Sequence, residues 1–197
     1  MSKSQFLIGM FIFSLLSPLS SWARVYGLVH FGYDHDGNDF ITVPYDNGRE
    51  SSITPGSGYL GRVGVGVSFE SLRGVLRNFD LQTTIGFKFD GIAKATNADL
   101  DWTRIPVELL GFYRFEQSSF RLGGGLTYHF ANELKGTGIT RMNHVFDSAL
   151  GGVIEGDYRF GVRDQMSVSL RYTMIHYTHD VFSIKANSLG IHAGFFF

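Results

Sequence analysis

The stretch YLGRVGVGVSFE, from Tyr59 to Glu70, decides the fold class. Its odd-numbered positions are apolar or glycine, and an aromatic residue stands at each end of that series. Its even-numbered positions are small or charged, with the exception of Leu60. Because successive side chains of a β-strand point to opposite faces, this alternation predicts a strand with one apolar face and one small or charged face.

Seven further segments alternate in the same way. Together with the first, they span residues 25–33, 59–70, 79–90, 104–115, 120–130, 146–160, 166–174 and 188–197. None of the apolar faces carries a charged residue, and the total of eight predicted strands is even. Pro106 interrupts the fourth segment, and because proline cannot donate a ladder hydrogen bond, we expect a bulge or a local break there.

Two features favour a barrel in a lipid bilayer over a soluble sandwich. The apolar faces carry aromatic residues at their ends and aliphatic residues between them, as in the aromatic girdles of membrane barrels. The connections alternate between short ones, at 70–79, 115–120 and 160–166, and longer ones, at 34–57, 90–101, 131–145 and 177–185. We therefore predict an all-β fold, an eight-stranded antiparallel transmembrane β-barrel in an up-and-down meander, with both termini on the periplasmic side.

The start of the chain predicts export. A basic residue, Lys3, precedes an apolar run from Phe6 to Leu16, and Ser21-Trp22-Ala23 provides small residues at a cleavage site. We expect residues 1–23 to be a cleaved signal peptide and residues 24–197 to form the barrel domain of a Gram-negative outer membrane. The chain has 17 basic and 18 acidic residues and no cysteine, so neither nucleic-acid binding nor a disulfide framework is expected.

The end of the chain, SLGIHAGFFF, resembles the C-terminal signature of outer-membrane barrels, in which a terminal phenylalanine follows alternating apolar positions. The matching residues are Leu189, Ile191, Ala193, Phe195 and Phe197. The whole pattern resembles the small eight-stranded outer-membrane family that includes the OmpA transmembrane domain and OmpX. The resemblance implies recognition by the barrel-assembly machinery, contact with outer-membrane lipid and lipopolysaccharide, and an extracellular partner bound through the outer loops.

The polar faces of the predicted strands are rich in charge. The residues expected to face the lumen are Arg62, Glu70, Asp80, Lys88, Arg104, Glu108, Arg114, Arg121, Asp147, Glu155, Asp157, Arg159 and Arg171. An eight-stranded barrel is only wide enough for its own side chains, and buried charges persist when they are paired. We predict a lumen plugged by ion pairs, with a narrow pore for small solutes as the alternative.

The first long connection begins with DHDGND, Asp34 to Asp39, whose oxygens are of the kind that calcium prefers. The glycine of this stretch does not stand where the calcium-loop pattern places it, so a solvated turn is the competing interpretation. Calcium binding there is left open, and no metal site or cofactor is predicted.

The stretch YHFAN, Tyr128 to Asn132, is similar to the His-x-Ser-Asn stretch of the lipid A deacylases, which are also eight-stranded barrels. His129 and Asn132 match, but Ala131 stands where the nucleophilic serine is required. We therefore expect no enzymatic activity, and a lipid A-modifying enzyme is the weaker alternative. The predicted function is a structural or surface-interaction role.

Overall fold

The computed structural model describes residues 23–36, 41–44, 50–95, 98–138, 142–179 and 182–197. Residues 1–22, which contain most of the predicted signal peptide, lie outside the described residues. Within the described part of the chain, no helix is both long enough and apolar enough to cross a membrane.

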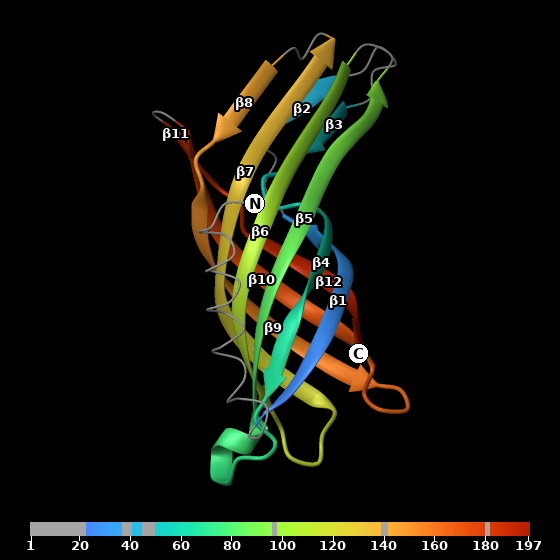
Figure 1. The fold of residues 1–197 in the computed structure, drawn as a ribbon. Helices are drawn as coiled ribbons and strands as arrows, with labels where there is room; N and C mark the ends of the chain where they lie inside the picture. Colours follow the sequence, from blue (N-terminus) through green and yellow to red (C-terminus); the bar gives the residue numbers. More distant parts are fainter. Residues whose placement is uncertain (1–22, 37–40, 45–49, 96–97, 139–141, 180–181) are drawn as a thin grey trace, which may run out of the picture.

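Eight strands close into one barrel (Figure 1). They are β1 (Arg24–His35), β4 (Gly58–Ser68), β5 (Phe79–Ala95), β6 (Ala98–Arg114), β7 (Phe120–Gly138), β9 (Ala149–Phe160), β10 (Met166–His179) and β12 (Ser188–Phe196). Each pairs antiparallel with the next barrel strand, and β12 returns to pair with β1. The predicted fold class, an eight-stranded antiparallel transmembrane meander, is confirmed.

The two ends of the barrel differ. At one end, here called the turn end, three short connections lie near the start of β1 and the end of β12, and one of them contains the short 3₁₀ helix η2 (Gly74–Asn78) (Figure 1). At the other, the ribbon end, several strands continue well past the barrel. Four short strands lie there: β8 (Met142–Phe146), paired with β7, β11 (Phe182–Lys185), paired with β10, and β2 (Ile41–Pro44) and β3 (Glu50–Ile53), paired with each other.

These extensions correct the predicted boundaries. The connections expected at 90–101, 131–145 and 177–185 are largely strand, because β5, β6, β7 and β10 keep their ladder hydrogen bonds beyond the apolar band. The mixed, polar composition of these segments gives no period-two signal, so the sequence did not indicate that pairing continues there.

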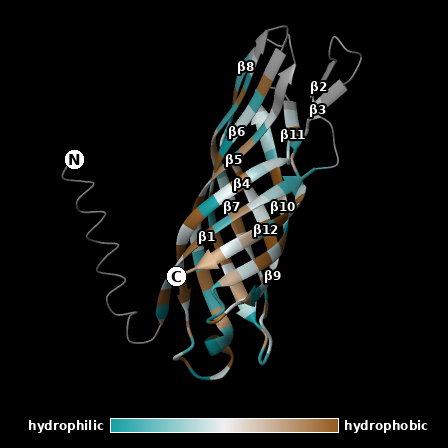
Figure 2. Cartoon of the chain, turned by 90° about the vertical axis from the view of Figure 1, so that its right-hand side faces the viewer, coloured by the Kyte–Doolittle hydropathy of each residue, from teal (hydrophilic) through white to brown (hydrophobic). Residues whose placement is uncertain are grey.

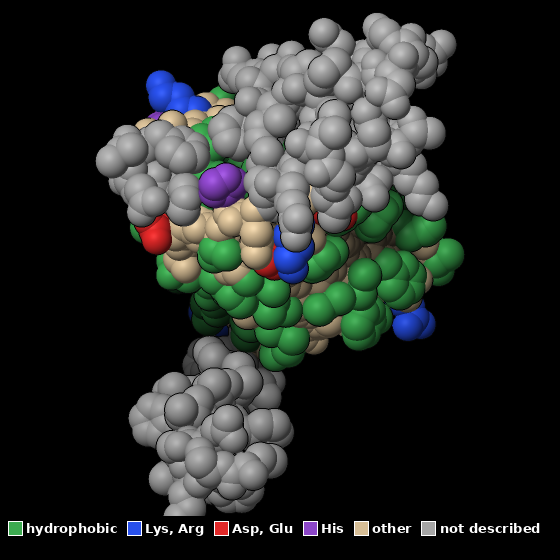
Figure 3. All heavy atoms as spheres, turned by 90° about the horizontal axis from the view of Figure 1, so that it is seen from above, with side chains coloured by type: hydrophobic (Ala, Val, Ile, Leu, Met, Phe, Trp, Pro, Cys, Tyr) green, Lys and Arg blue, Asp and Glu red, His purple; other side chains and the backbone are tan. Residues whose placement is uncertain are grey.

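The exterior of the barrel is apolar. Exposed side chains alternate with buried ones along every barrel strand, and the exposed ones include Val63, Val65, Leu126, Leu170 and Ile191. Hydrophobic and hydrophilic residues accordingly alternate along the strands in Figure 2, and apolar side chains gather along the visible flank of the barrel in Figure 3. An apolar surface of this extent suits hydrocarbon and not water.

The irregularity expected at Pro106 lies nearby instead. Pro106 is in register opposite His129, whereas the register shifts between Thr103 and Ile105. Across from this shift, Ala131 has a positive φ of 52°, so β7 holds an extra residue against β6. The closed ladder therefore accommodates the proline and bends one step away from it, as a β-bulge does.

The predicted strand 146–160 is also interrupted. The chain leaves the strand at Asp147 and Ser148, between β8 and β9. Phe146, expected on the lipid-facing side, is instead buried inside the ribbon end, where its ring stacks on that of Trp102 at 5.3 Å. The break allows β8 to turn its aromatic side chain inward while β9 keeps the predicted facing.

We predict that Val63→Arg destabilises the barrel in lipid. The Val63 side chain is 53% exposed on the outer face of β4, between Val29 of β1 and Ile85 of β5. A charge placed in the hydrocarbon there costs about 2–4 kcal/mol at the midplane. The free energy of unfolding in lipid vesicles, measured by denaturant titration, tests this.

Val75→Arg is the matched control, because Val75 is exposed on η2, outside the barrel strands. It should leave the free energy of unfolding nearly unchanged. Equal losses for the two variants would show that the outer face of β4 does not meet hydrocarbon.

Candidate functional site: the charged lumen

The interior of the barrel holds most of the charged side chains that alternate with the lipid-facing residues. They group into three sets along the barrel, here called the turn-end tier, the middle tier and the ribbon-end tier. Each tier is built from strands far apart in the sequence, because closure of the barrel brings their inward faces together.

The middle tier consists of two arginines and two glutamates. Arg62 of β4 contacts Glu108 of β6 at 3.0 Å and Glu155 of β9 at 3.1 Å. Arg171 of β10 contacts Glu155 at 2.9 Å and also forms an ion pair with Glu108. Each glutamate therefore lies between both arginines, and the four charges cancel within one closed ring.

Neutral side chains satisfy the remaining groups of the middle tier. Thr84 and Thr127 donate hydrogen bonds to the two carboxylate oxygens of Glu108, each at 3.2 Å. The Nη2 of Arg62 lies 3.3 Å from the Nδ1 of His30. Buried ions are tolerated when partners and additional hydrogen bonds replace the lost water, and this tier supplies both.

The turn-end tier is centred on Asp80 of β5. Arg121 contacts Asp80 at 2.7 Å and binds both oxygens of Asp157 through its Nε and Nη2 atoms. Arg114 contacts Asp80 at 3.0 Å. The Arg159 guanidinium lies 3.9 Å from the ring centroid of Phe196 and 3.9 Å from the nearest Asp80 oxygen.

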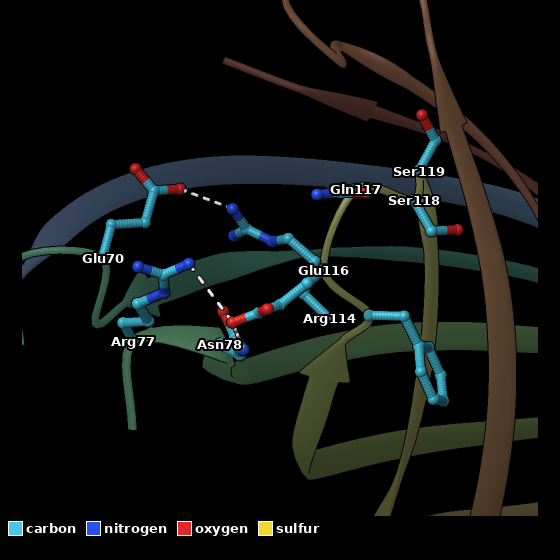
Figure 4. Close-up of a pocket in the computed structure, with 9 residues that line it drawn as sticks. Glu70, Arg77, Asn78, Arg114, Glu116, Gln117, Ser118 and Ser119 are labelled. Carbon is cyan, nitrogen blue, oxygen red and sulfur yellow. Dashed lines mark hydrogen bonds and ion pairs between the residues drawn. The ribbon is translucent and has the colours of Figure 1, made fainter. Parts of the chain in front are cut away.

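At the mouth of this tier, Arg114 also binds Glu70 at 2.7 Å. Figure 4 shows this pair lining a pocket, beside a second, exposed pair between Arg77 and Glu116 at 3.2 Å. The hydrogen bond from Arg114 holds the pKa of the Glu70 carboxyl below its usual value. Glu70 was predicted to face the lumen, but it lies in the turn after β4 and is exposed at the barrel mouth.

The ribbon-end tier contains Lys88 of β5 and Arg104 of β6. Lys88 binds Asp34 of β1 at 2.6 Å, and the other oxygen of Asp34 lies 2.9 Å from the Nε2 of His192. Arg104 has a different kind of partner: its two Nη atoms donate to the carbonyl oxygens of Pro55 and Ser57, at 2.5 and 2.6 Å.

The segment 54–57 fills the barrel at this level. All four of its residues are buried, although they precede β4 in a connection. Lys88 donates a further hydrogen bond to the Gly56 carbonyl at 2.5 Å, and the Gly56 amide donates to Asp36 at 3.0 Å. Two lumen cations and one carboxylate thus hold the backbone of 54–57 in place; we call this segment the plug.

An apolar cluster lies beyond the plug, inside the ribbon end. It comprises Leu100, Trp102, Leu134, Phe146, Ala149, Ile175, Tyr177, Ile184 and Ala186. The hydroxyl of Tyr177 lies 2.6 Å from the Nδ1 of His129, which is buried beneath the cluster. The interior therefore changes from charged to apolar toward the ribbon end.

The structure brings eleven of the thirteen predicted lumen residues inside the barrel, with Glu70 at its mouth. Asp147 was placed wrongly: it is exposed in the break between β8 and β9, where its Oδ2 accepts a hydrogen bond from Thr178. Sequence reasoning missed Asp34, His30 and His192 as partners. The signal was present for Asp34, since it continues the inward alternation of Leu28, His30 and Gly32, but it was assigned to the following loop.

The structure also places residues of the two other candidates from the sequence, the calcium loop and the deacylase-like histidine. Both oxygens of Asp34 are engaged within the lumen, and residues 37–39 of the calcium candidate lie outside the described residues. His129 faces the interior, as the alternation predicts, and its Nδ1 lies 2.6 Å from the Tyr177 hydroxyl. In the described ranges, no three His, Asp or Glu side chains are arranged to hold a metal ion.

The C-terminal signature residues lie on the outer face of β12 and just after it. Leu189, Ile191 and Phe195 are exposed there together with Phe197, while the intervening His192 and Phe196 point inward. The terminal backbone is fixed by two hydrogen bonds between Phe197 and Gly27, at 2.7 and 3.0 Å.

We predict that Glu155→Ala destabilises the barrel by about 3–5 kcal/mol, because it leaves Arg62 and Arg171 buried with a single glutamate between them. Adding Arg62→Met should recover part of the loss, since it removes the uncompensated charge. Equilibrium unfolding in lipid vesicles measures the single and the double variant against the unchanged chain.

Glu133→Ala is the control, because Glu133 pairs with Lys135 at 2.9 Å on the exposed ribbon end. An exposed pair contributes about 0–1 kcal/mol. If Glu155→Ala cost no more than Glu133→Ala, the middle tier would not be holding the barrel together.

No family model and no curated protein sequence matches the chain. Among solved structures, the chain is similar to Ail, the attachment invasion locus protein of Yersinia pestis, in complex with the heparin analogue sucrose octasulfate. The TM-score is 0.52 at 12% sequence identity, and the match covers 89% of this chain and 99% of that one. Neisserial surface protein A matches with a TM-score of 0.50 at 12% identity, over 88% and 97%. The chain has the fold of the small eight-stranded outer-membrane β-barrels.

Proposed function

We propose that this protein is an integral barrel of the Gram-negative outer membrane whose role is structural or in surface interaction, and that it is neither a pore nor an enzyme. The turn end would face the periplasm and the ribbon end the outside, following the asymmetry of outer-membrane barrels. Residues 1–23 would direct export and be cleaved off, and the barrel-assembly machinery would recognise the signature from Leu189 to Phe197.

The observation that carries this proposal is the filled interior. The middle tier joins β4, β6, β9 and β10 across the lumen at contact distances of 2.9–3.1 Å. The plug then occupies the ribbon end, with Arg104 and Lys88 bound to its carbonyl groups. A solute crossing the barrel would have to break ion pairs whose separate charges are costly to bury, so the lumen favours closure over transport.

The strands that continue past the barrel form the surface that we propose for interaction with a partner. β5, β6, β7 and β8 extend as paired ribbons at the ribbon end (Figure 1). Rigid scaffolds commonly carry binding residues on such outer connections. Lipopolysaccharide and an extracellular protein are therefore the partner classes that we propose for this end.

We predict that the folded chain gives no steady, porin-sized current in a planar lipid bilayer. An eight-stranded barrel is only wide enough for its own side chains, and among the described residues the charged tiers and the plug occupy that space. A general porin recorded in the same lipid is the positive control. Stable current steps of porin size from the intact chain would overturn the closed-lumen proposal and favour the narrow-pore alternative.

We also predict that ligand binding depends on the ribbon end. Replacing 93–99 and 136–142 by two-residue turns shortens both ribbons but keeps the strand pairs Ile92–Leu100 and Lys135–Asn143. The intact and trimmed chains, folded in the same detergent, are screened against host matrix proteins and lipopolysaccharide. Binding by the intact chain alone is the expected result, and equal binding by both would contradict a surface role for the ribbons.

A further inference from the structure

A pocket of about 190 Å³ opens at the turn end, between the starts and ends of several strands. Its walls include Arg24 and Tyr26 of β1, Arg114 of β6, Arg159 of β9 and Phe196 of β12. Arg163, in the turn between β9 and β10, also lines it. This pocket lies outside the middle tier and the plug, on which the proposed function rests.

Arg159 is left over when the carboxylates of the turn-end tier are assigned. Arg121 occupies both oxygens of Asp157 and one of Asp80, and Arg114 takes the other Asp80 oxygen. The Nε and Nη2 atoms of Arg159 are buried and have no hydrogen-bond partner among the described residues. Because a buried guanidinium without a hydrogen-bonded anion is costly, this group is poised to accept one.

The orientation of Arg159 is fixed by aromatic side chains. Its guanidinium lies 3.9 Å from the ring centroid of Phe196 and 5.4 Å from that of Tyr26. Both rings also line the pocket. A planar guanidinium held between aromatic rings keeps its N–H donors in one orientation, which lowers the conformational entropy lost when an oxyanion binds.

The remaining charge at the pocket favours an anion. Four arginines line it against two acidic side chains, Glu70 and Asp164. Glu70 is already bound by Arg114 at 2.7 Å. Arg24 and Arg163 are exposed and free to approach a ligand that Arg159 holds deeper in the pocket.

The rim of the pocket is apolar on its lipid side. Phe197, which lines the pocket, is 70% exposed, and Val162 beside Arg163 is 92% exposed. Side chains of this kind are at home where acyl chains meet headgroups, and arginines at that level meet phosphates. Guanidinium groups bind phosphate oxygens through paired, charge-assisted hydrogen bonds.

We propose that this pocket binds a phosphate group, with Arg159 as the buried anchor and Arg163 and Arg24 as the outer contacts. The phosphate comes either from a phospholipid headgroup of the surrounding leaflet or from free phosphate. Both sources present the same oxyanion, and the experiment separates them.

The test uses the barrel purified from outer membranes in a neutral detergent. Isothermal titration calorimetry is performed with inorganic phosphate and, separately, with short-chain phosphatidylglycerol, and short-chain phosphatidylcholine provides the zwitterionic comparison. Arg159→Gln is expected to weaken binding about tenfold or more, the effect of losing one charge-assisted contact. Arg77→Gln is the matched control, since Arg77 lies outside this pocket at the same end of the barrel (Figure 4).

The double variant Arg24→Gln with Arg163→Gln is the second test, because both side chains are exposed and neither belongs to the three charged tiers, so its loss should not prevent folding. It should also weaken binding, while heat-modifiable migration on gels confirms a folded barrel. Binding of inorganic phosphate identifies free phosphate as a ligand, and binding of phosphatidylglycerol alone identifies the lipid headgroup. Either result supports the site if the variants weaken it. No binding of either anion, or binding that Arg159→Gln and the double variant leave unchanged, overturns the proposal.

Discussion

The ring formed by Arg62, Glu108, Arg171 and Glu155 is the interaction on which the rest of the barrel depends. Hydrocarbon outside the barrel requires every ladder hydrogen bond to be closed and every polar side chain to turn inward. Once inside, those charges are out of reach of bulk water and are stable only when they neutralise one another. The ring meets this requirement with two cations and two anions from four different strands, so it also fixes which strands face each other across the lumen.

Such a ring also needs space, and glycine provides it. A β-carbon at Gly86 would lie 2.9 Å from the Gly61 carbonyl and 3.1 Å from the Cγ of Arg62. At Gly190 a β-carbon would overlap the Asp34 side chain and lie 2.8 Å from the Nε2 of His192. Long charged side chains and inward glycines are therefore two parts of one packing solution, in which the volume that one strand gives up is used by the arginine, aspartate or histidine of its neighbour.

The sequence was sufficient to predict the number of strands, their facing and most of the lumen, because a two-residue period is a local property. It could not supply the pairing. Arg62 contacts Glu108 because of the register in which β4, β5 and β6 pair. The alternation within one strand does not indicate which carboxylate of another strand an arginine will contact. Phe146 reversed its predicted facing for a similar reason: its stacking on Trp102 is a tertiary contact, and it outweighs the alternation that continues through β9.

At the ribbon end, the requirement that buried charges have partners is met by a loop that lies inside the barrel. Lys88 shares Asp34 with His192, and Arg104 binds no carboxylate in the described part of the chain. Backbone carbonyls of the plug take the place of the missing anions, because a carbonyl oxygen accepts from a cation without adding a charge that must itself be neutralised. Residues 54–57 are therefore held in place only when β5 and β6 bring Lys88 and Arg104 together inside the barrel. The apolar cluster around Trp102 then covers the plug, which keeps water from competing for the two cations, and the barrel passes from a charged interior to the ribbons that it presents at its far end.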